Sequence, residues 1–165
     1  PYYSVCQICS HELWQAFIEL QNEQPYDWEI WCLGVGDIQP INHPNIKHFG
    51  FVQPKDLANY TSQTGVFILP SRFEPWGVVV HEFAASGFPL LLSNKVGAKE
   101  QFLQEGKNGF VFKSESVNDI KQALKKIMNT KESDLIAMSD YSNTLSKSIS
   151  PKLWVESLLR MAKSK

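Results

Sequence analysis

Residues 70–87 read Pro-Ser-Arg-Phe-Glu-Pro-Trp-Gly-Val-Val-Val-His-Glu-Phe-Ala-Ala-Ser-Gly, and they follow the continuous apolar run 66–69. A short apolar run bounded by turn residues is typical of a strand buried on both faces of a parallel sheet. The prolines and the glycine of 70–77 predict a turn, and the mostly apolar stretch 77–86 predicts a helix that Gly87 closes. This stretch therefore predicts one strand–turn–helix step of an α/β fold.

The same alternation continues on both sides of this stretch. Apolar runs predict strands at 28–33, 46–51, 89–92 and 109–112, and helical spacing predicts helices at 10–25, 54–60, 98–103, 117–128 and 132–165, the last broken near residue 150. This rhythm predicts an α/β, Rossmann-like three-layer sandwich, in which a mainly parallel sheet carries helices on both faces. We expect residues 1–165 to form one domain, with helices in 131–165 packing on it through Trp154, Leu158 and Met161.

Composition limits the class of protein. The chain has 165 residues, 43% hydrophobic and 20% charged, which is the balance of one ordinary globular domain. Its formal net charge of -1 argues against a nucleic-acid partner, because such proteins usually carry a basic excess. No apolar run approaches the roughly 20 residues that span a bilayer, and residues 1–4 lack the parts of a signal peptide. We therefore expect a cytoplasmic protein with reduced cysteines.

Cys6 and Cys9 form a C-x-x-C pair close to His11. A zinc site needs four ligands and no second matched pair follows, whereas a redox pair needs an exposed, electropositive setting. Both alternatives stay open, but buried small hydrophobic side chains are the simpler interpretation. We expect neither a metal nor a cofactor.

Two carboxylates, Glu74 in the turn and Glu82 in the predicted helix, are separated by seven residues. Gly77 leaves room for a close backbone approach, and the free N–H groups at a helix start favour an anion such as phosphate. Glu74 can then accept hydrogen bonds from hydroxyls, and Glu82 can hold a diol such as ribose. Glutamates at this spacing are common, so the alternatives are an exposed helix residue and a charge favoured by the helix dipole. For His81 we favour a satisfied surface histidine.

Residues 70–89 resemble the signature of retaining GT-B glycosyltransferases, in particular the glycosyl transferases group 1 family with its two glutamates. That signature reads Pro-Ser-x-x-Glu-x-Phe-Gly, an apolar run, Glu-Ala and a later Gly-x-Pro. The matching positions here are Pro70, Ser71, Glu74, Gly77, Glu82, Ala84, Gly87 and Pro89. The turn also resembles that of glycogen and starch synthases. Segments 33–36, 45–52, 97–100 and 105–109 resemble further family turns in the same order.

The resemblance implies the C-terminal half of a GT-B enzyme, which binds a nucleoside-diphosphate sugar. Glu74 is then the catalytic-site residue that contacts hydroxyls of the donor sugar, while Glu82 binds the ribose and backbone groups bind the diphosphate and the base. The implied donor-binding residues are Gly34, Phe51, Val52, Phe73, Trp76, Gly77, Val78 and Glu82. Hydrogen-bond donors and positive charge, without a metal, would stabilise the leaving diphosphate.

One part of the family pattern is not found. The family places an Arg and then a Lys after the first strand of this domain, where both touch the diphosphate. We expect that strand and the basic pair upstream of residue 1, together with an N-terminal domain that binds the acceptor. The chain alone is then expected to bind donor weakly and to transfer nothing. Arg72 and Lys99 are the basic residues nearest to the predicted phosphates.

The predicted function is transfer of a hexose from a UDP-, GDP- or ADP-sugar, with retention, to a glycan or lipid-linked acceptor. Bacterial surface-polysaccharide biosynthesis is a common setting for the family, and the upstream part would then add peripheral contact with the inner face of the membrane. A non-catalytic Rossmann-like module that binds a nucleotide or a protein is the alternative. An epimerase of nucleotide sugars with the same architecture is a third hypothesis.

Overall fold

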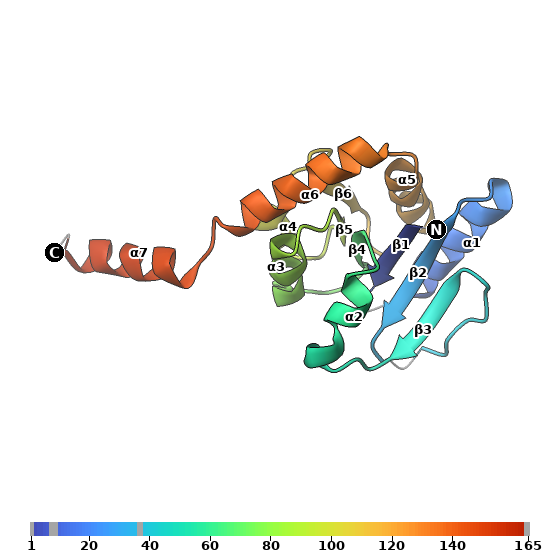
Figure 1. Ribbon diagram of the computed structural model, residues 1–165, viewed down its shortest axis with the longest axis horizontal. Helices are drawn as coiled ribbons and strands as arrows, with labels where there is room; N and C mark the ends of the chain where they lie inside the picture. Colours follow the sequence, from blue (N-terminus) through green and yellow to red (C-terminus); the bar gives the residue numbers. More distant parts are fainter. Residues whose placement is uncertain (1, 7–9, 36–37, 164–165) are drawn as a thin grey trace.

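The computed structural model describes residues 2–6, 10–35 and 38–163 of the chain. Within these residues, six parallel strands form one sheet in the order β3-β2-β1-β4-β5-β6 (Figure 1). They are β1 (Tyr2–Cys6), β2 (Trp28–Leu33), β3 (Ile46–Gly50), β4 (Val66–Leu69), β5 (Leu90–Ser93) and β6 (Gly109–Phe112). This is the order of a doubly wound sheet, in which the winding reverses between β1 and β4.

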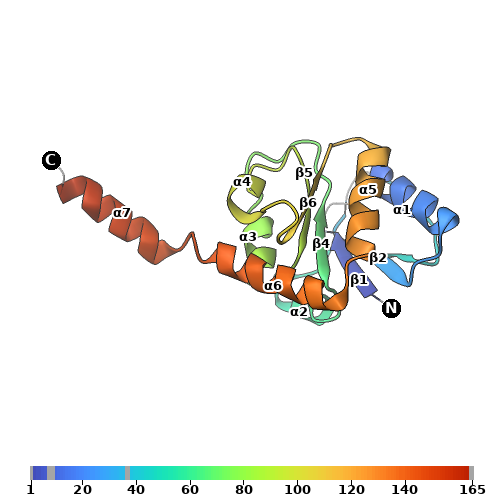
Figure 2. The same ribbon diagram turned by 90° about the horizontal axis from the view of Figure 1, so that it is seen from above.

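Helices cover both faces of the sheet (Figures 1 and 2). One face is packed by α1 (His11–Glu23) and α5 (Val117–Met128), which contact each other. The other face is packed by α2 (Ala58–Thr61), α3 (Val78–Ala85) and α4 (Lys99–Phe102). The 3-10 turn η1 (Pro54–Asp56) precedes α2, and α6 (Glu132–Ser146) and α7 (Pro151–Lys163) end the chain.

Strand β4 shows why two helical layers form. Successive side chains of a strand point to opposite faces. Val66 and Ile68 join the apolar cluster beneath α1 and α5, whereas Phe67 and Leu69 join the cluster beneath α3. All four side chains are buried, as expected for a parallel strand covered on both faces. The predicted α/β, Rossmann-like three-layer fold is confirmed.

Helix α1 begins where the sequence predicts. The Ser10 hydroxyl oxygen accepts a hydrogen bond from the Leu13 backbone N–H at 3.2 Å, and so satisfies one of the free N–H groups of the first turn. Leu13, Phe17 and Leu20 fall on one face and are buried against the sheet. The cap therefore fixes where the β1–α1 segment becomes helical.

The expectation that the first strand lies upstream of residue 1 is wrong. Tyr2–Cys6 forms β1, which pairs in parallel with β2 on one side and with β4 on the other. The short segment contains Ser4 and two tyrosines rather than a continuous apolar run, so its pattern alone did not mark it as a central strand. Residues 7–10, which join β1 to α1, are Gln-Ile-Cys-Ser and include no Arg or Lys. Cys9 of the C-x-x-C pair lies outside the described residues.

The two C-terminal helices differ in their surroundings. Helix α6 lies along α3, where the Asn143 side-chain amide donates a hydrogen bond to the Ala85 carbonyl oxygen at 2.7 Å. Helix α7 extends away from the sheet and its covering helices (Figures 1 and 2). Trp154 is 66% exposed, and Leu158 and Met161 are also exposed, so the expected packing of these three side chains on the body is wrong. No helix in the described ranges is both long and apolar enough to cross a membrane.

Candidate functional site

The turn between β4 and α3 is held by backbone hydrogen bonds to the segment that follows β5. The Glu74 N–H donates to the Lys95 carbonyl at 3.3 Å, and the Gly97 N–H donates to the Glu74 carbonyl at 2.9 Å. The Ala98 N–H donates to the Trp76 carbonyl at 2.8 Å. These bonds fix the backbone on both sides of Glu74, whose side chain is half-buried at the carboxyl edge of the sheet.

Glycine is required at two positions of this contact. Gly77 has a φ of +95° and is the N-cap of α3, and a Cβ there would lie 3.2 Å from Cγ of Glu74. A Cβ at Gly97 would lie 2.0 Å from the Pro75 carbonyl oxygen, a distance that no side chain can adopt. Gly77 therefore provides both the left-handed turn and the space beneath the Glu74 side chain.

Helix α3 has no side-chain cap, and in its first turn the Val80 N–H donates to the Gly77 carbonyl at 3.0 Å. The earlier N–H groups of this turn keep their capacity to bind an anion. Val78 begins this turn and is 64% exposed. Glu82 lies one turn further along and is also exposed, on the side of α3 away from the buried Phe83 and Ala84. The structure thus places both predicted glutamates on the β4–α3 unit, with the uncapped helix start between them.

Exposed apolar side chains flank Glu74 along the turn. Phe73 is 82% exposed and Trp76 is 45% exposed, with the Trp76 ring edge-on to Phe102 at 6.2 Å between centroids. His81 has another role, because its Nε2 lies 2.9 Å from the Ser146 carbonyl oxygen and its ring stacks on Phe102. The interpretation of His81 as a satisfied histidine is therefore confirmed.

The segments after β2 and β3 form the other half of the same edge. The Gly34 N–H donates to the Gly50 carbonyl at 2.6 Å, which joins the two segments. Phe51 and Val52 follow directly and line a hollow of about 460 Å³. Its other lining residues are Trp31, Phe49, Gln53, Asp56, Asn59, Tyr60 and Gln63.

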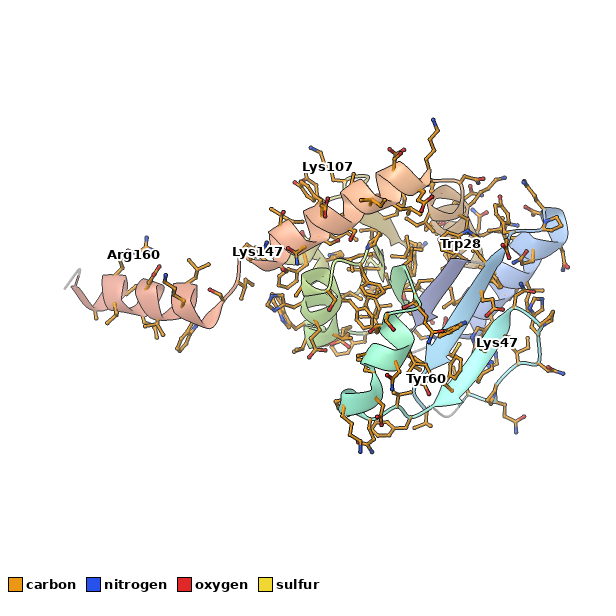
Figure 3. All side chains as sticks on the ribbon, in the orientation of Figure 1. Trp28, Lys47, Tyr60, Lys107, Lys147 and Arg160 are labelled. Carbon is orange, nitrogen blue, oxygen red and sulfur yellow. The ribbon has the colours of Figure 1, made fainter. Side chains whose placement is uncertain are left out.

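Aromatic rings form one wall of this hollow. The Phe49 ring lies 5.0 Å from the Trp31 ring and 5.0 Å from the Tyr60 ring, between centroids. Figure 3 shows Tyr60 at α2, close to β3. The predicted base-contacting residues therefore belong to an aromatic hollow with a polar rim, which the sequence did not indicate.

Arg72 links three segments of the carboxyl edge. Its Nη2 lies 2.5 Å from Glu12 Oε1 in the first turn of α1, and its Nε lies 3.4 Å from Glu115 Oε1 after β6. Burial alone would raise the pKa of Glu12, but hydrogen bonds from its own backbone N–H and from Arg72 outweigh burial, so that the pKa is lowered. Glu12 Oε2 is buried without a hydrogen-bond partner among the described residues. Sequence reasoning identified Arg72 but missed Glu12.

The predicted site residues thus lie on one edge of the sheet, in two groups. Gly34, Phe51 and Val52 lie beyond β2 and β3, and the residues of the β4–α3 turn lie beyond β4 and β5, with the end of β1 between the groups. In doubly wound sheets, ligands bind outside the carboxyl ends of the strands where the order reverses. In the ranges that the structure describes, no group of three His, Cys, Asp or Glu side chains is placed to hold a metal ion.

Comparison with known proteins identifies the family. The model of the family described as Glycosyl transferases group 1 matches residues 41–142. A relative from Klebsiella pneumoniae, described as an uncharacterized 41.2 kDa protein in the cps region, is 27% identical over 104 residues, which are 62% of this chain and 29% of that protein. The residues that the family model matches include Phe51, Val52 and the β4–α3 turn up to Glu82.

Two solved structures share the fold. Sucrose-phosphate synthase from Thermosynechococcus elongatus superposes with a TM-score of 0.74 at 16% identity, over 99% of this chain and 46% of that one. The pneumococcal O-GlcNAc transferase GtfA, solved with UDP and GlcNAc, superposes with a TM-score of 0.73 at 22% identity, over 99% of this chain and 36% of that one. The chain thus spans less than half the length of these relatives. Its match to the family model over residues 41–142 shows that the chain belongs to the glycosyl transferases group 1 family.

Proposed function

We propose that this chain is the nucleotide-sugar-binding domain of a retaining glycosyltransferase. The observation that carries the proposal is the β4–α3 turn, where a half-buried Glu74 lies beside the uncapped start of α3. Backbone hydrogen bonds to the segment after β5 hold this turn in place. Sugar hydroxyls are suited to a carboxylate, and a diphosphate is suited to free N–H groups at a helix start. The structure of GtfA with UDP and GlcNAc supports a ligand of this kind.

Each donor group then has a proposed partner. Glu74 accepts hydrogen bonds from hydroxyls of the sugar, and the backbone of Gly77 and Val78 donates to the diphosphate. Glu82 binds the ribose diol, and the backbone of Phe51 and Val52 contacts the base. Phe73 and Trp76 cover the sugar and exclude water from the reacting bond, which strengthens the electrostatic stabilisation of the departing diphosphate.

Transfer itself is proposed for the full-length protein. A hexose would pass from a UDP-, GDP- or ADP-sugar, with retention, to a glycan or lipid-linked acceptor bound by a second domain. We place this activity in the cytoplasm or at the inner face of the membrane, in polysaccharide biosynthesis. The relative from the cps region of Klebsiella pneumoniae supports the setting.

Calorimetric titration of the full-length protein with UDP, GDP and ADP, followed by the matching sugar nucleotides, tests the proposal. We expect one nucleoside diphosphate to bind and its sugar conjugate to bind more tightly, because Glu74 adds its contact only when the sugar is present. If none of the three nucleotides binds, the proposal is wrong. Binding without release of nucleoside diphosphate in the presence of mixed glycan acceptors would instead favour a non-catalytic binding module.

A further inference from the structure

Arg72 lies at the point where the strand order of the sheet reverses. It follows β4, and Glu12, its partner at 2.5 Å, lies in the first turn of the helix that follows β1. Strands β1 and β4 are hydrogen-bonded neighbours, and the sheet order reverses between them. The Arg72–Glu12 pair therefore crosses the crevice in which a doubly wound sheet receives its ligand.

Arg72 is the arginine of this edge, which also carries Lys95 after β5 and Lys113 after β6. Residues 1–46 contain no Lys or Arg, so the segments after β1 and β2 contribute no permanent positive charge. Lys99, at the start of α4, lies 2.5 Å from the carboxylate of Glu100. Among the ion pairs of the described residues, that of Arg72 joins the β4–α3 turn to the first turn of α1.

The free protein holds this guanidinium with carboxylates that can release it. The Arg72 side chain is 58% exposed, as is that of Glu115. Glu12 uses Oε1 for Arg72, while Oε2 has no hydrogen-bond partner among the described residues. The Arg72–Glu115 contact is exposed at both side chains and contributes little to stability. The Glu12 side chain is only 18% exposed, so a ligand that takes Arg72 must offset the loss of the Glu12 contact.

We propose that Arg72 binds the diphosphate of the donor. In the absence of donor, Glu12 forms an ion pair with the Arg72 guanidinium. This inference rests on the proposed function. A diphosphate carries more negative charge than a carboxylate, and the planar fork of a guanidinium matches two of its oxygens at once. The donor therefore competes with Glu12 for Arg72, and Glu12 lowers the affinity for every nucleoside diphosphate.

A purely structural ion pair would behave differently from this exchange. If the pair only joins α1 to the β4–α3 turn, removing either partner changes the site in the same direction. If Glu12 competes with the diphosphate for Arg72, removing Arg72 lowers the affinity for the diphosphate and removing Glu12 raises it. The sign of the change on removing Glu12 therefore separates the two roles.

The experiment measures the dissociation constants of UDP, GDP and ADP for the full-length wild-type protein and for its variants R72Q, R72K, E12Q and R160Q. Uridine, guanosine and adenosine serve as ligands without phosphate. Arg160 is the other arginine of the sequence and lies on α7, far from the sheet (Figure 3), so that R160Q is matched in charge. We expect R72Q to weaken binding of the nucleoside diphosphate at least about tenfold, the loss of one charge-assisted bond. E12Q should tighten this binding, R72K should lie between wild type and R72Q, and nucleoside binding should not change.

Two results would overturn the inference while leaving the proposed function intact. They are equal affinities of R72Q and R160Q for the nucleoside diphosphate, and weaker binding by E12Q than by wild type. If wild type binds none of the three nucleotides, the proposed function itself fails. Because E12Q is predicted to gain affinity, a folding defect cannot imitate the expected outcome for that variant.

Discussion

A Cβ atom on Gly97 would lie 2.0 Å from the carbonyl oxygen of Pro75, so the segment after β5 touches the β4–α3 turn backbone to backbone. Hydrogen bonds from Gly97 to Glu74 and from Ala98 to Trp76 flank this contact. The position of Glu74 thus depends on a glycine in another loop, and a side chain at residue 97 must push the turn outward.

Gly97→Ala should therefore destabilise the protein and displace Glu74. We expect a loss of about 1–3 kcal/mol in the free energy of unfolding, as for other overpacked sites, together with weaker sugar-nucleotide binding. Urea denaturation and calorimetry measure the two effects. Gly65→Ala is the control, since a Cβ there has no atom within 4 Å. Equal stability of the two variants would show that the Gly97–Pro75 contact can accommodate a Cβ atom without a loss of stability.

Glu82 and Glu74 should affect different ligands. Glu82→Ala is expected to weaken binding of the nucleoside diphosphate itself by about tenfold or more, because the ribose diol loses its charged acceptor. Glu74→Ala should leave this affinity nearly unchanged but remove the extra affinity of the sugar conjugate. Titrations of both ligands check the difference, with the exposed α7 variant Glu156→Ala as control. Equal losses for the nucleoside diphosphate alone would contradict the assigned roles.

The cap of α1 gives a prediction about stability. Ser10→Ala leaves the Leu13 N–H without its hydroxyl acceptor, and we expect a loss of about 0.5–2 kcal/mol in unfolding free energy. Ser133→Ala, an exposed serine within α6, should change it far less. Denaturant titration at neutral pH makes the comparison. A similar loss in both variants would mean that the Ser10 hydroxyl has no special role.

Glu12 should make stability depend on pH. The folded-state pKa of Glu12 lies below its ordinary value of 4.5, so the ionised carboxylate stabilises the fold above that pH. This contribution is lost as the pH falls through the lower, folded-state value. The difference in unfolding free energy between wild type and E12Q should accordingly shrink on acidification. In an R72Q background the difference at neutral pH should be smaller, because the ionised carboxylate has lost its partner. A difference that stays constant from neutral to acid pH would refute the coupling.

Local sequence predicts the parts of the fold that bury continuous apolar runs. Residues 66–69 are recognisable as a strand because both of their faces are covered, and the step from Pro70 to Gly77 is recognisable because its backbone needs prolines and a glycine. Strand β1 is different, since its place comes from pairing with β2 and β4 rather than from its own residues.

Long-range contacts account for what the sequence does not show. Arg72 and Glu12 lie 60 residues apart and meet only because β1 and β4 are neighbours in the sheet. The apolar face of α7 predicts a helix, but the pattern does not show that Trp154 stays exposed. The aromatic hollow beside Phe51 likewise needs Trp31, Phe49 and Tyr60 from three separate elements.

The central position of β1 also sets the order in which the sheet can form. Its Ser4 pairs with Ile30 on one side and with Val66 on the other, so that the second pairing closes a loop of more than sixty residues. Until β4 has been synthesised, one edge of β1 has no strand to pair with, and an open edge is a template for other chains. Parallel pairings of such long range form slowly. Folding should therefore be limited by the docking of β4 onto β1, and the nascent chain is most prone to aggregate before that step.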